Sequence, residues 1–225
     1  MTSLPPARLP RPATQGLRDR LKAAIPPSLL VRDLGPVPDR SILLTFDDGP
    51  HPDTTAEVLA RLRACGARAV FFMIGERIDA APHVAAEVAA AGHRIGNHTY
   101  SHQAPDLWLG AYYTDVRQCQ QACRRHVGAA PTLFRPPKGH LSLTSLVVPK
   151  TLGLKTVNWS LNVRDWACED RAQALDAAER LVRHASAGDI VLLHDDRRLV
   201  LPLLDFVLPR LIDAGFDLSS GAARL

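Results

Sequence analysis

Long apolar runs are missing from this sequence, and their absence excludes a membrane-spanning helix. The N-terminal stretch also lacks the uninterrupted apolar core of a signal peptide, because prolines and arginines break it up. No CxxC pair occurs among the four cysteines, Cys65, Cys119, Cys123 and Cys168. Together these absences predict a cytoplasmic protein without a transmembrane segment, whose cysteines stay reduced.

Two of the cysteines, Cys119 and Cys123, stand four residues apart in a predicted helix and therefore share one face of it. Two thiols at this spacing could contact a metal, but buried free thiols are far more frequent. An even number of cysteines would permit disulfides in an oxidising compartment. We expect buried, unpaired side chains at both positions.

A strong charge of either sign is also missing. The chain has 27 lysines and arginines against 23 aspartates and glutamates, a net charge of +4 with its nine histidines neutral. Many of the arginines fall on predicted helix faces rather than in one basic stripe, so nucleic acid is not expected as a partner. The 225 residues, of which 46% are hydrophobic, are enough for one globular domain with a sizeable core.

Residues 1–38 are rich in proline and arginine, which separates this N-terminal arm from the domain expected over residues 39–225. The prolines prevent a long helix or a central strand. Two helical turns remain possible between Leu17 and Ile25, with Leu17, Leu21 and Ile25 on one face. Such a basic amphipathic turn could rest weakly on an anionic membrane surface, but an arm that packs on the domain is the simpler expectation.

Strands and helices alternate from residue 41 onward, which predicts an α/β protein with a mainly parallel sheet or barrel. Short apolar runs predict strands at residues 42–46, 69–74, 94–97, 132–134, 155–159 and 189–194. Helices are predicted at residues 54–64, 82–91, 115–127, 171–184 and 200–214, the first with a capping box from Thr54 to Glu57. Reactive groups in such folds gather at the carboxyl ends of the strands, so polar residues there are candidates for a site.

Two adjacent carboxylates, Asp47 and Asp48, end the first predicted strand. Neighbouring side chains on a strand point to opposite faces unless a turn or bulge redirects one of them, and Gly49 and Pro50 supply a turn. Like charges this close are unfavourable unless a cation or an arginine separates them. Taken alone, the pair is more often a solvated turn than a site.

Two histidines, His98 and His102, follow the strand at residues 94–97. At a spacing of four they can meet one metal from a helical turn or a compact loop, and imidazole suits zinc and its neighbours. With one carboxylate from the first strand they make a site of three protein ligands. Three ligands leave an open position, which is typical of a catalytic metal. The alternative is a pair of exposed loop histidines.

Three further strand ends carry polar residues. Arg135 begins an Arg-Pro-Pro-Lys-Gly loop whose prolines fix the backbone, and it could pair with Asp47. Asp165 could hold a catalytic partner, with Trp166 packing beside the site. His194, after a buried apolar run, is a reasonable general acid. An ordinary loop, a buried tryptophan and a structural histidine are the plainer alternatives.

The five motifs TFDDG, HTYSH, RPPKG, NVRDW and LLH, in this order, resemble those of the polysaccharide deacetylases, carbohydrate esterase family 4, which contain the NodB homology domain. The resemblance covers roughly residues 40–220. It implies a distorted (β/α) barrel and a metal-dependent hydrolase that removes N-acetyl groups from an amino sugar, oligosaccharide or polysaccharide. The implied cofactor is one divalent metal, zinc first, with cobalt, manganese or nickel as alternatives.

The resemblance also implies a role for each motif residue. The general base would be Asp47, oriented by Arg135, and the metal ligands would be Asp48, His98 and His102. The general acid would be His194, held by Asp165. The substrate would meet the Lys138 backbone amide as an oxyanion donor, and would also meet Pro137, Trp166 and Leu192, the last two lining the pocket for the acetyl methyl.

Two positions depart from the family pattern. Lys138 stands where a tyrosine is usual, and Asn162 stands where the fourth motif usually begins with aspartate. A backbone donor survives the first change, but the side-chain contacts with substrate need not. Two other functions remain open: a metal amidohydrolase for a small non-sugar amide, and a glycan-binding relic without catalysis. The relic should have lost a metal ligand or the base, and this chain has kept all four residues.

Overall fold

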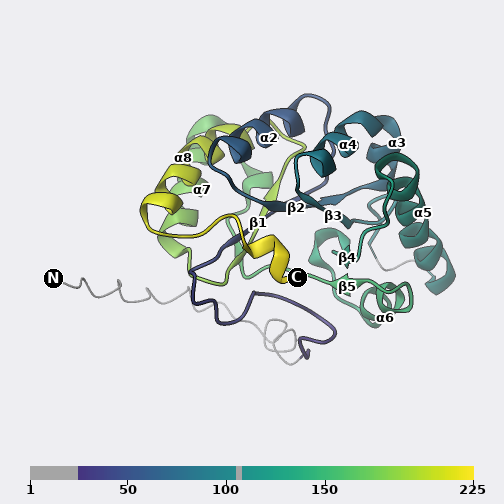
Figure 1. Ribbon diagram of the computed structural model, residues 1–225. Helices are drawn as coiled ribbons and strands as arrows, with labels where there is room; N and C mark the ends of the chain where they lie inside the picture. The colour runs from purple at the N-terminus through teal and green to yellow at the C-terminus, as the bar shows by residue number, and fades with distance from the viewer. Residues whose placement is uncertain (1–24, 105–107) are drawn as a thin grey trace.

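A single parallel sheet organises the chain in the computed structural model, which describes residues 25–104 and 108–225. Its seven strands run in the order β5-β4-β3-β2-β1-β7-β6, and every pair is parallel. Their bounds are β1 Leu43–Asp47, β2 Ala69–Met73, β3 Arg94–Asn97, β4 Leu133–Phe134, β5 Lys155–Thr156, β6 Leu161–Asn162 and β7 Ile190–His194. The sheet curls into a half-barrel, so the predicted α/β barrel is confirmed (Figure 1).

Helices surround the curved sheet and connect successive strands (Figure 1). They are α2 Thr54–Ala64, α3 Gly75–Ala80, α4 Pro82–Ala90, α5 Leu109–Val127, α6 Leu143–Thr151, α7 Arg171–His184 and α8 Val200–Asp213. Three short 3₁₀ turns are η1 Pro137–Gly139, η2 Asp165–Ala167 and η3 Gly221–Arg224. The sequence pattern missed α3 and α6, and it placed the start of α5 six residues too late. No described helix has both the length and the apolar character needed to cross a bilayer.

The capping box predicted at the start of α2 is wrong. The N-cap is Asp53, and its side chain makes no capping hydrogen bond. Thr54 and Thr55 lie inside the helix and are buried, and the Thr55 hydroxyl donates to Asp195 at 2.5 Å. Thr54 is already a helical residue, so its hydroxyl does not stand at the N-cap, and it has no hydrogen-bond partner among the described residues.

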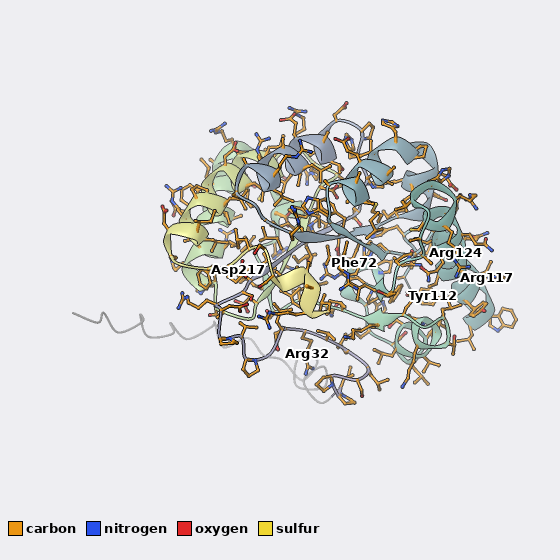
Figure 2. All side chains as sticks on the ribbon, in the orientation of Figure 1. Arg32, Phe72, Tyr112, Arg117, Arg124 and Asp217 are labelled. Atoms are coloured by element: carbon orange, nitrogen blue, oxygen red, sulfur yellow. The ribbon has the colours of Figure 1, made fainter. Side chains whose placement is uncertain are left out.

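The two faces of the sheet carry two different cores. Leu44 and Phe46 of β1 pack toward the outer helices, whereas Leu43 packs inside the barrel with Phe72 and Ile190. Figure 2 shows Phe72 within the packed interior, while Arg117 and Arg124 project outward from α5. The predicted buried, unpaired thiols of Cys119 and Cys123 are confirmed on the inner face of α5.

The described end of the N-terminal arm packs against the barrel. Leu30 is buried, and single bridges join Val31 to Val157 and Asp33 to Asp189. Except for Ile25, the helix predicted for residues 17–25 lies outside the described residues. The basic residues of the arm that precede Ile25 lie outside them too. The boundary between arm and domain near residue 38 stays a prediction.

Candidate active site

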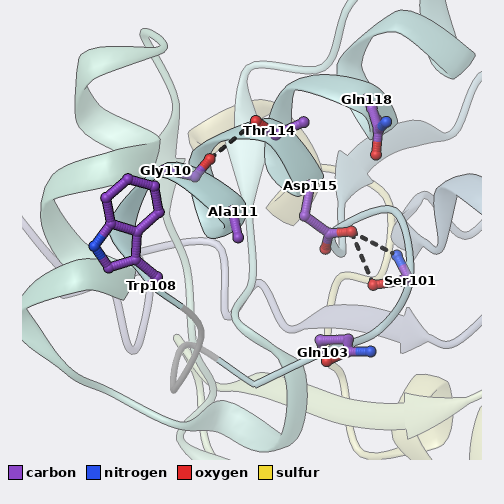
Figure 3. A pocket seen from close by; sticks show the side chains of 8 residues that line it. All are labelled: Ser101, Gln103, Trp108, Gly110, Ala111, Thr114, Asp115 and Gln118. Atoms are coloured by element: carbon purple, nitrogen blue, oxygen red, sulfur yellow. Dashed lines mark hydrogen bonds between the residues drawn. The ribbon is translucent and has the colours of Figure 1, made fainter.

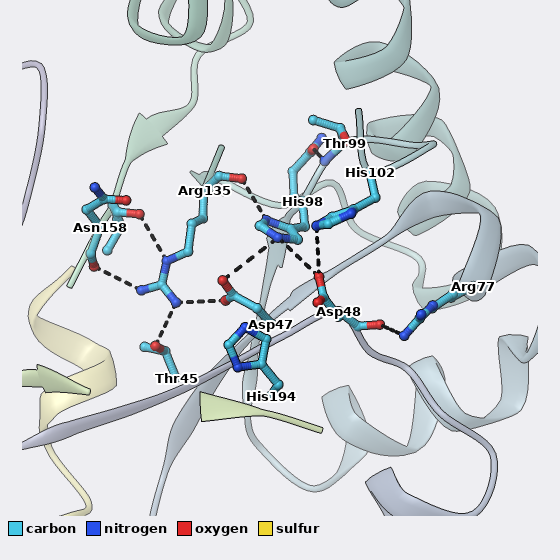
Figure 4. Close-up of polar contacts among 12 residues, drawn as sticks. Thr45, Asp47, Asp48, Arg77, His98, Thr99, His102, Arg135, Asn158 and His194 are labelled. Carbon is cyan, nitrogen blue, oxygen red and sulfur yellow. Dashed lines mark hydrogen bonds and ion pairs between the residues drawn. The ribbon is translucent and has the colours of Figure 1, made fainter. Parts of the chain in front are cut away.

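Strands β1, β3 and β7 end at one edge of the sheet, and the candidate site is built there (Figure 4). The strand register pairs Asp47 of β1 directly with His194 of β7. Met73 at the end of β2 pairs with Asn97 at the end of β3. The loop that begins at His98 therefore starts level with the ends of the neighbouring strands. The parallel pairing therefore gathers motifs that are far apart in sequence.

The turn after β1 brings both carboxylates to the same side. Asp48 has φ +71°, in the left-handed region that residues with a Cβ rarely adopt. Its carbonyl accepts a hydrogen bond from the Arg77 guanidinium, which also pairs with Asp196 at 3.3 Å. The change of backbone direction overrides the strand alternation, so Asp47 and Asp48 face one centre.

Asp48, His98 and His102 form a cluster that fits a divalent metal. One ligand atom from each lies within 4.8 Å of the others, and Asp48 Oδ1 is 3.1 Å from His102 Nε2 and 3.4 Å from His98 Nε2. His98 Nδ1–H donates to the Arg135 carbonyl at 2.8 Å, which leaves the His98 Nε2 lone pair directed at Asp48. Asp48 Oδ1 is buried and has no hydrogen bond of good geometry in the described structure. An orphaned carboxylate oxygen facing two imidazole nitrogens is the donor set that a metal such as zinc accepts.

The electrostatics of the cluster favour an ionised carboxylate. Burial by itself would raise the pKa of Asp48, but the close contacts and charges of His102 and His98 outweigh it and hold that pKa well below its usual range. Metal binding requires the deprotonated carboxylate. Asp48 is therefore ready to act as a ligand across the ordinary pH range.

The loop that carries the two histidines is held by side chains that the sequence did not reveal. Thr99 and His102 have φ values of +64° and +56°. The Thr99 amide donates to Asn97 at 2.8 Å. Asp115 of α5 accepts three hydrogen bonds, from the amides of Tyr100 and Ser101 and from the Ser101 hydroxyl. Asp115 lies in the middle of a helix, and only its burial in the structure indicates this role.

Arg135 is completely buried and positions Asp47. One Nη donates to Asp47 Oδ1 and to Thr45, both at 2.7 Å, and the other Nη and Nε donate to the carbonyls of Asn158 and Val157. Burial lowers the pKa of Arg135, and the charge of Asp47 opposes that shift. The predicted pairing of Arg135 with Asp47 is present, and it leaves Asp47 Oδ2, 3.8 Å from His98 Nε2, directed toward the metal cluster.

His194 and Asp165 form a second pair. His194 Nδ1 lies 3.0 Å from Asp165 Oδ1, and the His194 amide donates to Asp165 Oδ2 at 2.7 Å. Burial would lower the pKa of His194, but the hydrogen bond with Asp165 and the charges of Asp165, Asp47 and Asp48 raise it to about 9. The imidazole is therefore fixed in orientation and disposed to carry a proton.

The remaining predicted residues lie around these pairs. Lys138 has φ +56° in η1, and its amide makes no hydrogen bond with another described residue. Pro137 is buried beside it, and Leu192 is buried on β7. Trp166 is 46% exposed, with the Arg164 guanidinium 5.3 Å from its ring. The structure thus places these four near the strand ends, and their contacts with substrate stay predictions.

Asp195 is a further residue of the site, to which the sequence motifs gave no role. It is fully buried beneath the Asp47–Gly49 turn, and burial, the largest influence, raises its pKa to about 7. A Cβ on Gly49 would lie 2.4 Å from Asp195 Oδ1, so the carboxylate packs directly on the glycine. Asp195 also accepts from Thr55, whose hydroxyl in turn accepts from the His51 amide. This chain of contacts fixes the turn that carries Asp48.

Comparisons with known proteins identify the class. The sequence profile of the polysaccharide deacetylases matches residues 34–157. A peptidoglycan-N-acetylglucosamine deacetylase of Bacillus cereus is 37% identical over 184 residues, covering 79% of this chain and 84% of the relative. A chitooligosaccharide deacetylase of Azorhizobium caulinodans is 33% identical over 194 residues, covering 79% and 91%. A family 4 carbohydrate esterase from Streptomyces lividans, solved with acetate, superposes with a TM-score of 0.71 at 29% identity, over 78% of this chain and 90% of its own.

This chain belongs to the polysaccharide deacetylase family, as its five motifs indicated. Its relatives named above are hydrolases of acetylated sugars, so assignment to a family of metal-dependent deacetylases is confirmed.

Proposed function

We propose that this chain is a metal-dependent N-deacetylase of an amino sugar in an oligosaccharide or polysaccharide. One observation carries the proposal: two buried pairs, Arg135 with Asp47 and Asp165 with His194, flank the three-residue ligand cluster on neighbouring strands. Amide hydrolysis needs both a base, to activate water, and an acid, to protonate the departing nitrogen. A base and an acid, each held by its own partner, meet that need.

The base in this scheme is Asp47. Its Oδ1 is occupied by Arg135, while Oδ2 faces the ligand cluster and is free to take a proton from the attacking water. The Arg135 hydrogen bond keeps the carboxylate from rotating, so the base stays oriented toward the substrate. A divalent ion held by Asp48, His98 and His102 would supply Lewis acidity, which lowers the pKa of water and polarises the carbonyl.

The acid is His194. Its Nδ1 is held by Asp165, so Nε2 is the atom that can deliver a proton to the leaving amine. The raised pKa of His194, about 9, keeps that proton on the ring at neutral pH. Without protonation an amine is a poor leaving group, which is why the ring must be charged before the bond breaks.

The negative charge that develops on the acetyl oxygen needs a donor. The Lys138 amide, free of partners among the described residues and set in a left-handed turn, is the donor that we assign. A fixed donor of this kind is worth about 3–4 kcal/mol in the transition state. The role belongs to the backbone, so the change from the family's usual tyrosine leaves it intact.

Zinc is the metal that we propose, because two imidazoles and one carboxylate make a borderline donor set. Cobalt, manganese and nickel are the alternatives. Stripping the protein with a chelator and reloading it with each ion separates them. Highest acetate release with zinc supports the assignment, and a clear preference for another ion overturns it.

Release of acetate from a panel of substrates tests the function itself. The metal-loaded protein would be given acetylated monosaccharides, oligosaccharides and small non-sugar amides. Turnover of the sugars supports the proposal, whereas turnover of the small amides alone indicates the amidohydrolase. A glycan-binding relic would bind oligosaccharides without releasing acetate.

A further inference from the structure

Most of the exposed apolar side chains belong to two neighbouring helices. Seven large hydrophobic side chains are exposed among the described residues. Five of them belong to α5, its N-cap residue and α6: Trp108, Leu109, Tyr113, Leu143 and Val147. Because α5 and α6 pack against each other through Tyr112, Val116 and Val148, the helices that carry these five side chains lie side by side (Figure 1).

These five side chains, called the apolar patch below, follow helical spacing. Leu109 and Tyr113 stand four residues apart on α5, and Leu143 and Val147 do so on α6, so each pair shares one face of its helix. The exposed fraction reaches 84% for Trp108 and 79% for Leu143. Exposed apolar side chains that occur singly are ordinary, whereas several on adjoining helices indicate an interaction surface.

The same part of the chain is strongly basic, although the chain as a whole is nearly balanced. Residues 108–164 contain eight lysines and arginines and a single acidic residue, Asp115. Asp115 is buried, and its carboxylate accepts hydrogen bonds from Tyr100 and Ser101 of the metal-ligand loop (Figure 3). Five of the cations are exposed and form no ion pair with a described residue: Arg117, Arg124, Lys138, Lys150 and Arg164. No exposed carboxylate within residues 108–164 therefore opposes this positive charge.

Exposed aliphatic side chains bordered by unpaired cations fit the surface of an anionic bilayer. Leucine and valine can enter the boundary of the hydrocarbon, and tryptophan and tyrosine favour the level of the headgroups. Acidic headgroups attract lysine and arginine. A second copy of this chain is a poorer occupant, because a two-fold axis would bring two basic faces together. An acidic polymer would satisfy the cations but would leave the aliphatic side chains in water.

We propose that the apolar patch and its flanking cations dock this protein reversibly on a bilayer that contains anionic phospholipid. The docking face adjoins the candidate site, because Asp115 of α5 holds the loop that carries His102. Lys138 belongs to the turn that supplies the assigned oxyanion donor. Docking there keeps the candidate active site close to the membrane surface. The inference goes beyond the proposed function, since lipid binding is measured without any sugar.

Vesicle sedimentation with the whole chain tests the proposal. Vesicles of phosphatidylcholine alone are compared with vesicles of phosphatidylcholine mixed with phosphatidylglycerol. We expect binding to the mixed vesicles that weakens as salt is added, because salt screens the headgroup charge. The variant Arg117→Gln, Lys150→Gln should lower the partition coefficient by about fivefold for each cation removed. The variant Leu109→Ser, Leu143→Ser should lower it several-fold without changing the net charge.

Matched controls are available on the opposite side of the sheet order. Ile212 on α8 is 42% exposed, and Arg171 is exposed at the start of α7. Ile212→Ser and Arg171→Gln should leave the partition coefficient unchanged, and thermal melting verifies that every variant is folded.

Three outcomes would overturn the proposal. The first is an absence of binding to the mixed vesicles. The second is equal binding by all variants, which is also what binding through the N-terminal arm would give, because the arm is the same in each of them. The third is a dimer, seen by sedimentation velocity without vesicles, that Leu109→Ser, Leu143→Ser dissociates; a second copy would then be the occupant of the apolar patch.

Discussion

Asp48 Oδ1 lies 3.1 Å from His102 Nε2, and both residues adopt left-handed backbone conformations, with φ values of +71° and +56°. Such conformations cost about 1–3 kcal/mol each and persist only where the surroundings enforce them. The enforcing contacts are long-range: Asp195 packs under the first turn, and Asp115 holds the second loop. The fold thus maintains strain at the two points where ligands must converge.

Removal of the histidine ligands should abolish metal binding. In the His98→Ala, His102→Ala double variant one carboxylate remains, which is too few ligands for a divalent ion. We expect loss of both bound metal and acetate release, measured by elemental analysis and a product assay. His83→Ala, at an exposed position on α4, is the control and should retain both. Full metal content in the double variant would contradict the ligand assignment.

Asp47→Asn should separate chemistry from metal binding. The amide keeps an acceptor for Arg135 but cannot take a proton, so turnover should fall by about 10²–10⁴-fold while metal content stays normal. Arg135 would also lose its buried counter-ion, and such losses cost about 3–5 kcal/mol of stability. Activity should therefore be expressed per folded, metal-loaded molecule, with folding monitored by thermal melting. Near-normal kcat would mean that another group is the base.

The pH profile should report on His194. Its folded pKa of about 9 lies above the ordinary histidine pKa of 6.5, so the stabilisation from its pairing with Asp165 is fully present below pH 6.5 and is lost as the pH rises through 9. Activity that needs the protonated ring should decline along the same alkaline limb. A bound divalent ion offsets the charges of Asp47 and Asp48, so the limb of the loaded enzyme should lie below 9.

Two variants check that assignment. Asp165→Asn removes the charge that helps to raise the pKa, so the alkaline limb of kcat should move to lower pH. His194→Ala should remove the limb and much of the rate. If the alkaline limb of kcat keeps its position in both variants, His194 is not the general acid.

Gly49 should tolerate no side chain. Gly49→Ala puts a Cβ 2.4 Å from the Asp195 carboxylate. Because that carboxylate is buried and held by Thr55, we expect the turn to shift and carry Asp48 away from the histidines. We expect weaker metal retention, measured by competition with a chelator. Adding Asp195→Ala makes room and should restore part of the affinity, a coupling that a double-mutant cycle detects. If the second substitution only lowers metal affinity further, Asp195 does not constrain the turn.

The cytoplasmic location inferred from the N-terminal composition stays a prediction. All four cysteines are unpaired in the structure, and Cys119, Cys123 and Cys168 are buried. Cell fractionation with a thiol count measures both properties together. Recovery of the protein from an extracellular or periplasmic fraction would make finished wall glycan the first substrate to examine.

The sequence alone determined the α/β architecture and the set of reactive residues. Apolar runs followed by polar motifs are local patterns, so the strands ending at Asp47, Asn97 and His194 could be read directly. The rigid loop after Arg135 already suggested its pairing with Asp47, the family resemblance added the pairing of Asp165 with His194, and the structure contains both contacts. Short elements such as α3 gave too little periodicity to recognise.

Only the tertiary structure decided how those residues converge. Strand alternation would send Asp47 and Asp48 to opposite faces, and the positive φ of Asp48 that reverses this depends on Asp195, nearly 150 positions away. The Thr54 capping box failed because Asp53 occupies the N-cap position, and the neighbouring Thr55 donates to the same distant carboxylate. In the sequence Asp115 is an ordinary helix residue, and only the structure shows that the His98 loop packs against it. Local patterns record periodicity and turn chemistry, whereas these contacts depend on which distant segments the sheet brings together.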